Sequence, residues 1–160
     1  MDKLNIRNFK LKNYPGIAAI IINNKNKKIL LLKRRNIPVI QNPGLWSFLF
    51  GGKKKNEKYI DAAYREIKEE TGLKKDTLIL LKKPIKILIF ESRSKKCWYN
   101  YLFIFFSNTT LIKLSIENSK YRWANLSDIF NEKLYKNIFI NKGKIEKLIK
   151  SSINTTKKRN

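Results

Sequence analysis

The sequence contains no histidine, a single cysteine and few acidic residues. Its 160 residues include 36 Lys and Arg but only 12 Asp and Glu, which gives a formal net charge of +24. Without histidine, imidazole is unavailable as a metal ligand or as a general base. Cys97 alone can form neither an intramolecular disulfide nor a multi-cysteine metal cluster, and no histidine activates its thiol. We therefore expect Cys97 to be a buried structural residue and acid–base chemistry to depend on carboxylates.

Long apolar runs are also missing. Runs such as Ile17–Ile22 and Ile29–Leu32 are far too short to cross a bilayer. Residues 1–14 carry several charged side chains and no apolar run, so they do not resemble a secretory signal. The sequence therefore predicts a cytoplasmic protein that has no membrane partner.

The large positive charge has two interpretations that the sequence leaves open. A strongly basic surface favours polyanionic partners such as nucleic acid and nucleotides. However, Lys, Asn and Ile dominate the chain and share AT-rich codons, so genome composition alone would raise the number of surface lysines. RNA contact through a lysine-rich surface is therefore one expectation, and compositional drift is the other.

The pattern of apolar residues predicts one α/β domain. No internal repeat or Pro/Gly/Ser-rich linker divides the chain, so we expect a lead-in at residues 1–14, a single domain at 15–150 and a frayed basic tail at 151–160. The expected strands are Gly16–Ile22, Ile29–Leu32, Leu45–Phe50, Leu78–Leu81, Ile85–Phe90, Trp98–Phe106 and Tyr121–Trp123. The expected helices are Tyr59–Thr71, Asp128–Phe130 and Lys144–Ile149. Because strands alternate with helices, we expect a mixed sheet with helices on both faces.

Aromatic residues recur at every second position of the strand expected at Trp98–Phe106. Tyr99, Tyr101, Phe103 and Phe105 would share one face of that strand. A stripe of this kind is typical of a core, so we expect all four rings to be buried rather than to stack on nucleobases.

One segment departs from the basic character of the rest. Residues 57–70 contain five acidic and three basic residues, a local charge of −2. Within it, Tyr59, Ala62, Ala63 and Ile67 keep helical spacing, and Gly72 follows where a helix would end. We therefore expect the carboxylates of this predicted helix to have a specific structural or functional role.

Three of these acids share one face of the predicted helix. Glu66, Glu69 and Glu70 are separated by three and four residues, a spacing that brings their side chains together. Like charges repel at this spacing, so the trio favours a bound divalent cation. Oxygen ligands without His or Cys suit Mg²⁺ or Mn²⁺. The alternative is a solvated acidic face that pairs with nearby lysines.

These acids belong to a longer pattern. Its members are Gly51, Glu57, Arg65, Glu66, Ile67, Glu69, Glu70, Gly72 and Leu73. Their spacing resembles the Nudix box, G-x5-E-x7-R-E-U-x-E-E-x-G-U with U an aliphatic residue, at all nine specified positions. The resemblance to the Nudix hydrolase superfamily covers roughly residues 15–150, because Leu45–Phe48 before the glycines and Glu117-x5-Trp123 after the box are also similar.

The glycine end departs from the usual family pattern. Members usually have Pro-Gly-Gly and then five residues before the first glutamate, whereas here Phe50 precedes the pair and four residues separate Gly52 from Glu57. The box therefore aligns on Gly51, or else the loop is one residue short. Either Gly51 or Gly52 is expected to turn its carbonyl toward the metal.

The resemblance implies roles for individual residues within a Nudix-type α/β/α sandwich. The implied metal ligands are Glu66, Glu69 and Glu70, with Gly51 or Gly52. The implied catalytic residues are Glu69, Glu70 and Glu117, any of which could be the general base, and Arg65, which would orient a glutamate of the box. The expected substrate-binding residues are Arg34, Arg35, Lys53 and Lys55, although the lysines of this loop are equally consistent with drift.

The resemblance also implies an activity. We expect Mg²⁺-dependent or Mn²⁺-dependent cleavage of a diphosphate linkage in a nucleoside triphosphate, a nucleotide sugar or a dinucleoside polyphosphate. One alternative is a pyrophosphohydrolase that acts on RNA 5′ ends, and another is a catalytically silent Nudix-fold module that binds RNA. Homodimers are common in the family, so a homodimer is a further expectation.

Overall fold

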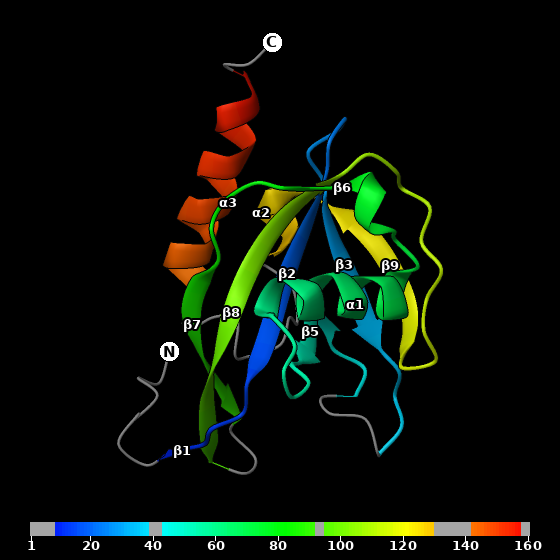
Figure 1. Ribbon diagram of the computed structural model, residues 1–160. Coiled ribbons are helices and arrows are strands. Elements are labelled where there is room, and N and C mark those ends of the chain that lie inside the picture. Colours follow the sequence, from blue (N-terminus) through cyan, green and yellow to red (C-terminus); the bar gives the residue numbers. More distant parts are fainter. Residues whose placement is uncertain (1–8, 39–42, 92–94, 130–141, 158–160) are drawn as a thin grey trace.

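The computed structural model describes residues 9–38, 43–91, 95–129 and 142–157, and Figure 1 shows their arrangement. Within them, one mixed sheet lies between α1 (Tyr59–Thr71) on one face and α3 (Lys142–Lys157) on the other, as predicted. The strands are β1 (Lys10–Leu11), β2 (Gly16–Asn23), β3 (Ile29–Arg34), β4 (Trp46–Ser47), β5 (Leu49–Gly52), β6 (Leu78–Leu80), β7 (Ile85–Glu91), β8 (Lys96–Ser107) and β9 (Asn118–Ala124). The short helices are η2 (Lys75–Thr77) and α2 (Leu126–Ile129).

The strands β2 and β8 form the centre of the sheet. They run parallel and pair over the whole length of β2, from Gly16 with Asn100 to Asn23 with Ser107. On its other edge, β2 pairs antiparallel with β5 at its start and with β3 at its end. Every residue of β2 is buried, which explains its unbroken apolar sequence.

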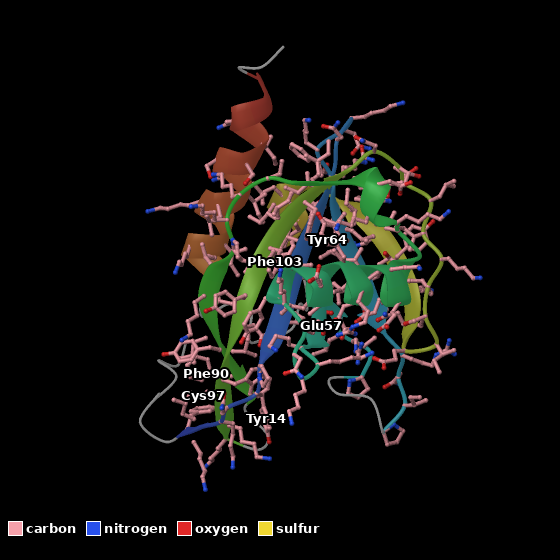
Figure 2. The ribbon with its side chains drawn as sticks, viewed as in Figure 1. Tyr14, Glu57, Tyr64, Phe90, Cys97 and Phe103 are labelled. Atoms are coloured by element: carbon pink, nitrogen blue, oxygen red, sulfur yellow. The ribbon has the colours of Figure 1, made fainter. Side chains whose placement is uncertain are left out.

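Two cores form because residues of β2 alternate between the faces of the sheet. Ala18, Ile20 and Ile22 pack in the core that α3 covers, where Ile145 and Ile149 also lie. Ile17, Ala19 and Ile21 face α1 instead, in a core that contains Ala62, Ala63 and Ile67. Figure 2 shows Phe103 and Tyr64 on the α1 side and Tyr14, Phe90 and Cys97 near the lower end of the sheet. Cys97 is buried, as predicted.

The predicted strand Leu45–Phe50 is two strands, because its halves have different neighbours. β4 pairs with β3, whereas β5 pairs with β2 and continues through Gly51 and Gly52. The glycine pair therefore belongs to a strand rather than to the loop after it.

The C-terminal helix is longer than predicted. It continues to Lys157, so the expectation of a frayed tail from residue 151 is wrong as far as the described residues reach. The apolar spacing of Ile145 and Ile149 continues to the half-buried Ile153, and Ser152 is buried with its hydroxyl donating to the Leu148 carbonyl. Within the described residues, no helix has the length and apolarity needed to span a membrane.

Smaller differences occur at the edges of the sheet. Phe103 and Phe105 of the aromatic stripe are buried, but Tyr99 is 42% exposed because it lies near the start of β8, and Lys86 covers its ring at 4.2 Å. The predicted lead-in contributes β1, which pairs in parallel with the start of β8. The short helix begins at Leu126, and its predicted end at Phe130 lies outside the described residues.

Candidate active site

The helix α1 holds the acidic residues at a fixed position beside the sheet. Its small residues Ala62 and Ala63 are fully buried and allow a close approach to β2 and β5. The helix ends at Gly72 as predicted; the φ of this residue, 71°, is left-handed, and its N–H donates to the Lys68 carbonyl at 2.9 Å. The acidic face of α1 is thus oriented by packing on one side and by a glycine stop at its end.

A pocket of about 690 Å³ lies beside this acidic face, a size that suits a small ligand. Its acidic end contains Glu66, Glu69, Glu70 and Glu117, together with Arg34 and the glycine pair. Its aromatic end contains Tyr14, Trp98, Asn100 and Lys96. Asn100, Gly16 and Gly52 are register neighbours on β8, β2 and β5, so the pocket crosses two strand spacings, about 10 Å.

The two glycines have different surroundings. A Cβ atom at Gly51 would collide with the Glu66 side chain, whereas one at Gly52 would meet nothing within 4 Å. The N–H of Gly52 donates to the Glu66 carboxylate, and its carbonyl accepts from Arg65 Nη2 at 2.8 Å. Gly51 therefore makes room for Glu66, and Gly52 holds that carboxylate beside the guanidinium.

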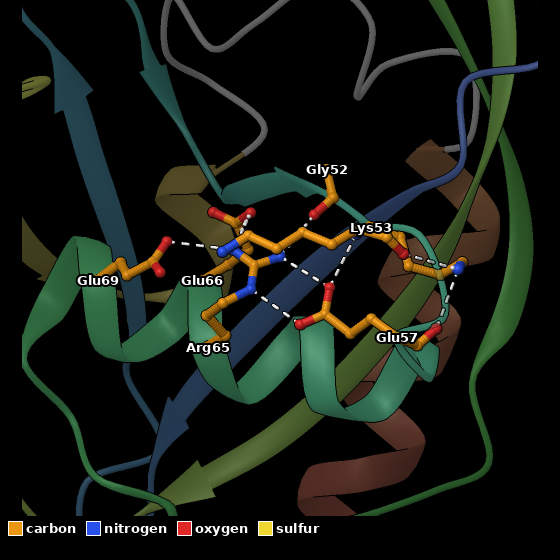
Figure 3. A network of polar contacts seen from close by, with 7 residues as sticks. Gly52, Lys53, Glu57, Arg65, Glu66 and Glu69 are labelled. Carbon is orange, nitrogen blue, oxygen red and sulfur yellow. Dashed lines mark hydrogen bonds and ion pairs between the residues drawn. The ribbon is translucent and has the colours of Figure 1, made fainter.

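Arg65 ties three glutamates together, as Figure 3 shows. Its Nε and Nη2 donate to the two Glu57 oxygens at 2.8 and 3.0 Å, and its Nη1 donates to Glu66 at 2.8 Å and to Glu69 at 3.1 Å. The bond to Arg65 lowers the pKa of Glu57 to about 2, and the bond to Glu57 raises the pKa of Arg65. Arg65 does not line the pocket, so it positions carboxylates rather than facing a ligand.

The loop between β5 and α1 turns its lysines away from the pocket. Lys53 Nζ donates to the carbonyls of Lys54 and Glu57 at 3.0 and 2.9 Å and lies 5.4 Å from the Tyr59 ring centre. Lys55 is exposed, and neither Lys53 nor Lys55 lines the pocket. The structure thus does not bring these two predicted phosphate-binding residues to the site.

Glu70 is the most deeply placed carboxylate of the acidic end. It is 8% exposed, and burial raises its pKa to about 7 against the opposing effects of a hydrogen bond from Asn118 and the charge of Arg34. Asn118 Nδ2 donates to Glu70 Oε2 at 3.0 Å. Burial also raises the pKa of Glu66. Asn118 was not predicted, because its burial depends on β9 pairing with β3.

Arg34 and Arg35, both predicted to bind substrate, contact the segment around Glu117 in different ways. Arg34 Nη2 lies 2.9 Å from Glu117 Oε2 and lines the pocket. Arg35 does not line it; its N–H donates to the Glu117 carbonyl at 2.8 Å and its Nε to the Ile116 carbonyl at 2.7 Å. Arg34 is therefore placed to meet a ligand, whereas Arg35 fixes the loop that carries Glu117.

The acidic end has the donor chemistry for a hard divalent cation. Within the part of the chain that the structure describes, no three such side chains are already placed around one metal position. Arg65 explains this, because its guanidinium lies between Glu66 and Glu69 and neutralises them. Carboxylate oxygens of this kind are the ligand type that Mg²⁺ and Mn²⁺ prefer.

The comparisons with known proteins agree with this arrangement. Residues 12–145 match the family model of the NUDIX domain. An RNA pyrophosphohydrolase of Pelagibacter ubique is 30% identical over 135 residues, which cover 76% of this chain and 81% of that protein. An ADP-ribose pyrophosphatase of Methanocaldococcus jannaschii is 38% identical over 73 residues, 46% of this chain and 41% of that protein.

A solved structure shares the fold. The MutT protein from Methanosarcina mazei Go1 is 23% identical and superposes with a TM-score of 0.67 over 93% of this chain and 97% of its own. At this identity, the likeness shows the fold alone, and it confirms the expected α/β/α sandwich.

Proposed function

Because the chain belongs to the NUDIX family and is a Nudix hydrolase, we propose that it cleaves a diphosphate linkage in a nucleoside diphosphate derivative with the help of Mg²⁺. Nucleoside triphosphates, nucleotide sugars and dinucleoside polyphosphates are the candidate substrates. The observation that carries the proposal is that Glu66, Glu69 and Glu70 line one pocket large enough for such a ligand.

The carboxylates of Glu66, Glu69 and Glu70 would hold the cation where Arg65 now neutralises two of them. When bound, the cation supplies positive charge to the diphosphate and lowers the pKa of a coordinated water. Arg65 keeps its bidentate contact with Glu57 and thereby holds the start of α1 against the glycine loop. The protein thus keeps these three carboxylates together at one end of the pocket.

Arg34 is the substrate-binding residue that the pocket supports best. Of the four predicted phosphate-binding cations, Arg34 alone lines the pocket. A planar guanidinium binds phosphate oxygens through two parallel hydrogen bonds. We infer that Arg34 exchanges its contact with Glu117 for a phosphate of the substrate.

Removal of a proton from the attacking water falls to Glu69, Glu70 or Glu117. Glu69 and Glu117 each expose 54% of their side chains, whereas Glu70 is buried and its pKa is raised to about 7. A cation bound at this group would lower that pKa again, so the choice among the three rests on their positions. Glu70 is the most deeply buried of them and is therefore the first residue to substitute.

The test is to incubate the full chain with Mg²⁺ and a panel of the candidate substrates, with and without EDTA, beside Glu70→Gln. We expect release of a phosphate-containing product from at least one substrate, loss of release with EDTA, and a kcat about 100-fold lower for Glu70→Gln. Asp76→Asn makes the same acid-to-amide change in the exposed η2 and should stay within about twofold. No product from any substrate, or full activity of Glu70→Gln, contradicts the proposal.

The 5′ end of an RNA is the second candidate substrate. The relative named as an RNA pyrophosphohydrolase and the net charge of +24 favour it. A 5′-triphosphorylated RNA therefore belongs in the panel. RNA binding that is steeply salt-dependent but without turnover would instead support a catalytically silent RNA-binding module.

A further inference from the structure

The aromatic end of the pocket has features that cleavage of a diphosphate does not require. The rings of Tyr14 and Trp98 meet edge to face with their centres 5.8 Å apart, and both line the cavity. Tyr14 is half exposed, so it is accessible to a ligand in the cavity. Aromatic faces beside a cavity stack with nucleobases of any sequence. A flat ring can therefore be held here, about 10 Å across the sheet from the glycine pair.

Asn100 adds a buried polar group to this end of the pocket. Its side chain is 3% exposed, and its Nδ2 donates to the Ile17 carbonyl at 3.1 Å. Its Oδ1 has no hydrogen-bond partner among the described residues, and a Cβ at Gly16 would collide with that oxygen. A buried acceptor without a partner is unfavourable, because it has lost its hydrogen bonds to water and gained none in the protein. Asn100 is thus suited to accept a hydrogen bond from an N–H group of a base.

Positive charge continues from the aromatic end along the sheet. Lys96 lines the pocket and lies four residues before Asn100, about 13 Å along β8 and on the same face. Lys10 is the register partner of Lys96 in the parallel β1–β8 pair, so it shares that face. Lys95 adjoins them, since its carbonyl accepts from the Lys10 N–H at 2.8 Å.

We call Lys10, Lys12, Lys95 and Lys96 the lysine cluster. The N–H of Lys12 donates to the Cys97 carbonyl at 2.7 Å, which fixes it beside the other three. The backbone of Glu91 in β7 is the register partner of Lys96 on the opposite edge of β8.

From these observations we propose that the substrate is the 5′ end of an RNA chain. The first base lies against Tyr14, Trp98 and Asn100, and the following backbone phosphates lie on Lys96 and Lys10. This inference rests on the proposed function and narrows its substrate. Charge complementarity supports it, because the pocket leads directly from carboxylates suited to a metal to lysines suited to a second, more distant phosphate.

The test compares two substrates that share the same 5′ nucleotide. One is a 5′-triphosphorylated RNA of about six nucleotides, and the other is the corresponding nucleoside triphosphate. The variant is Lys10→Glu/Lys96→Glu, and the matched control is Lys25→Glu/Lys28→Glu in the turn between β2 and β3. This turn follows the end of β2 opposite Gly16 and carries one exposed and one half-buried lysine, as the lysine pair does.

We expect the lysine-pair variant to lose about tenfold more kcat/KM on the RNA than on the nucleoside triphosphate. For a single strand, each lost phosphate contact lowers the slope of log affinity against log salt by about 0.7, so the slope should fall by about 1.4. In the control variant, kcat/KM should change by the same factor on the RNA and on the nucleoside triphosphate. The Tm of each variant is measured by thermal unfolding, to check that the chain remains folded.

Two results overturn the inference in different ways. If the lysine-pair variant loses equal activity on both substrates, or no more than the control, the cluster does not bind an RNA chain although the proposed function stands. If the wild-type protein releases product from none of the substrates in Mg²⁺, the proposed function fails and this inference fails with it.

Discussion

The helices α1 and α3 cover opposite faces of one sheet and treat their charged residues in opposite ways. Each packs an apolar stripe at helical spacing, with Ala63 and Ile67 on α1 and Ile145 and Ile149 on α3. On α3, the acid Glu146 is partly exposed and pairs with the exposed Lys150 at 2.8 Å, one turn further along. On α1, by contrast, Glu66 and Glu70 are largely covered by the protein.

This difference separates two uses of an amphipathic helix. A carboxylate that loses water without gaining a partner is costly, so such groups are retained where a cation or a ligand needs them. An exposed ion pair one turn apart contributes about 0.3–0.5 kcal/mol and places few demands on its surroundings. The burial of acids, rather than the apolar stripe, is therefore what distinguishes α1, which lines the pocket, from α3, which does not.

The largest expected difference is in kcat, when a glutamate is replaced by glutamine on α1 and, separately, on α3. Glu66→Gln on α1 should lower kcat by about 100-fold, because it removes a charge from the acidic end of the pocket. Glu146→Gln on α3 should change kcat by less than about twofold. Steady-state kinetics on the substrate found in the panel measures both, and equal effects would remove the distinction between the helices.

A second prediction concerns how closely each helix approaches its neighbours. Gly51→Ala should destabilise the protein by about 1–3 kcal/mol and lower activity, because its Cβ would overlap the Glu66 side chain. Gly143→Ala at the start of α3 should not destabilise the protein, because the added Cβ meets no atom within 4 Å. Alanine also favours a helix over glycine, by about 1 kcal/mol in a helix interior. Urea unfolding of both variants checks this. An unchanged midpoint for Gly51→Ala would mean that Glu66 relocates freely.

The smallest effect is expected from acid titration at the start of α1. The pKa of Glu57 falls from 4.5 to about 2 on folding, chiefly through its hydrogen bond to Arg65. Because the folded state prefers the ionised carboxylate, its bond to Arg65 contributes its full stability above about pH 4.5. This contribution is lost as the pH falls toward 2 and Glu57 becomes protonated. Glu57→Gln should therefore lower the Tm near pH 6 and reduce its dependence on pH between 5 and 2. Parallel Tm curves for both proteins would contradict this role.

The helix and its acidic face could be predicted because local spacing determines them. Tyr59–Thr71 is helical over the predicted bounds, and Gly72 ends it with a left-handed φ. Glu66, Glu69 and Glu70 line one pocket because residues three and four apart on a helix share a face. Nothing beyond this segment was needed to place the three carboxylates together.

The edges of the sheet could not be predicted from local pattern. Lys10 and Leu11 carry no strand periodicity, and they become a strand through main-chain hydrogen bonds with the start of β8. Tyr99 continues the apolar alternation of β8, yet its exposure depends on which elements cover that end of the strand. In both cases, residues distant in sequence decide the outcome.

The same reason explains the site residues that sequence reasoning missed or misplaced. Asn118 reaches Glu70 only because β9 pairs with β3, and Arg35 holds the Glu117 loop only because these strands meet. Lys53 follows the glycine pair but bonds to carbonyls of its own loop. Asn100 had one local signal, since it is a polar residue inside an aromatic strand.

The parallel pairing of β2 with β8 also has a consequence for how the protein folds. Asn100 bonds to the carbonyl of Ile17 across 83 residues of chain. Pairing at such separation comes late, because the entropy of closing the intervening loop opposes it before the contacts form. Gly16 of β2 and Asn100 of β8 both line the pocket, so the cavity is incomplete until these two strands pair. A nascent chain thus acquires its binding site only after the ribosome has released β8.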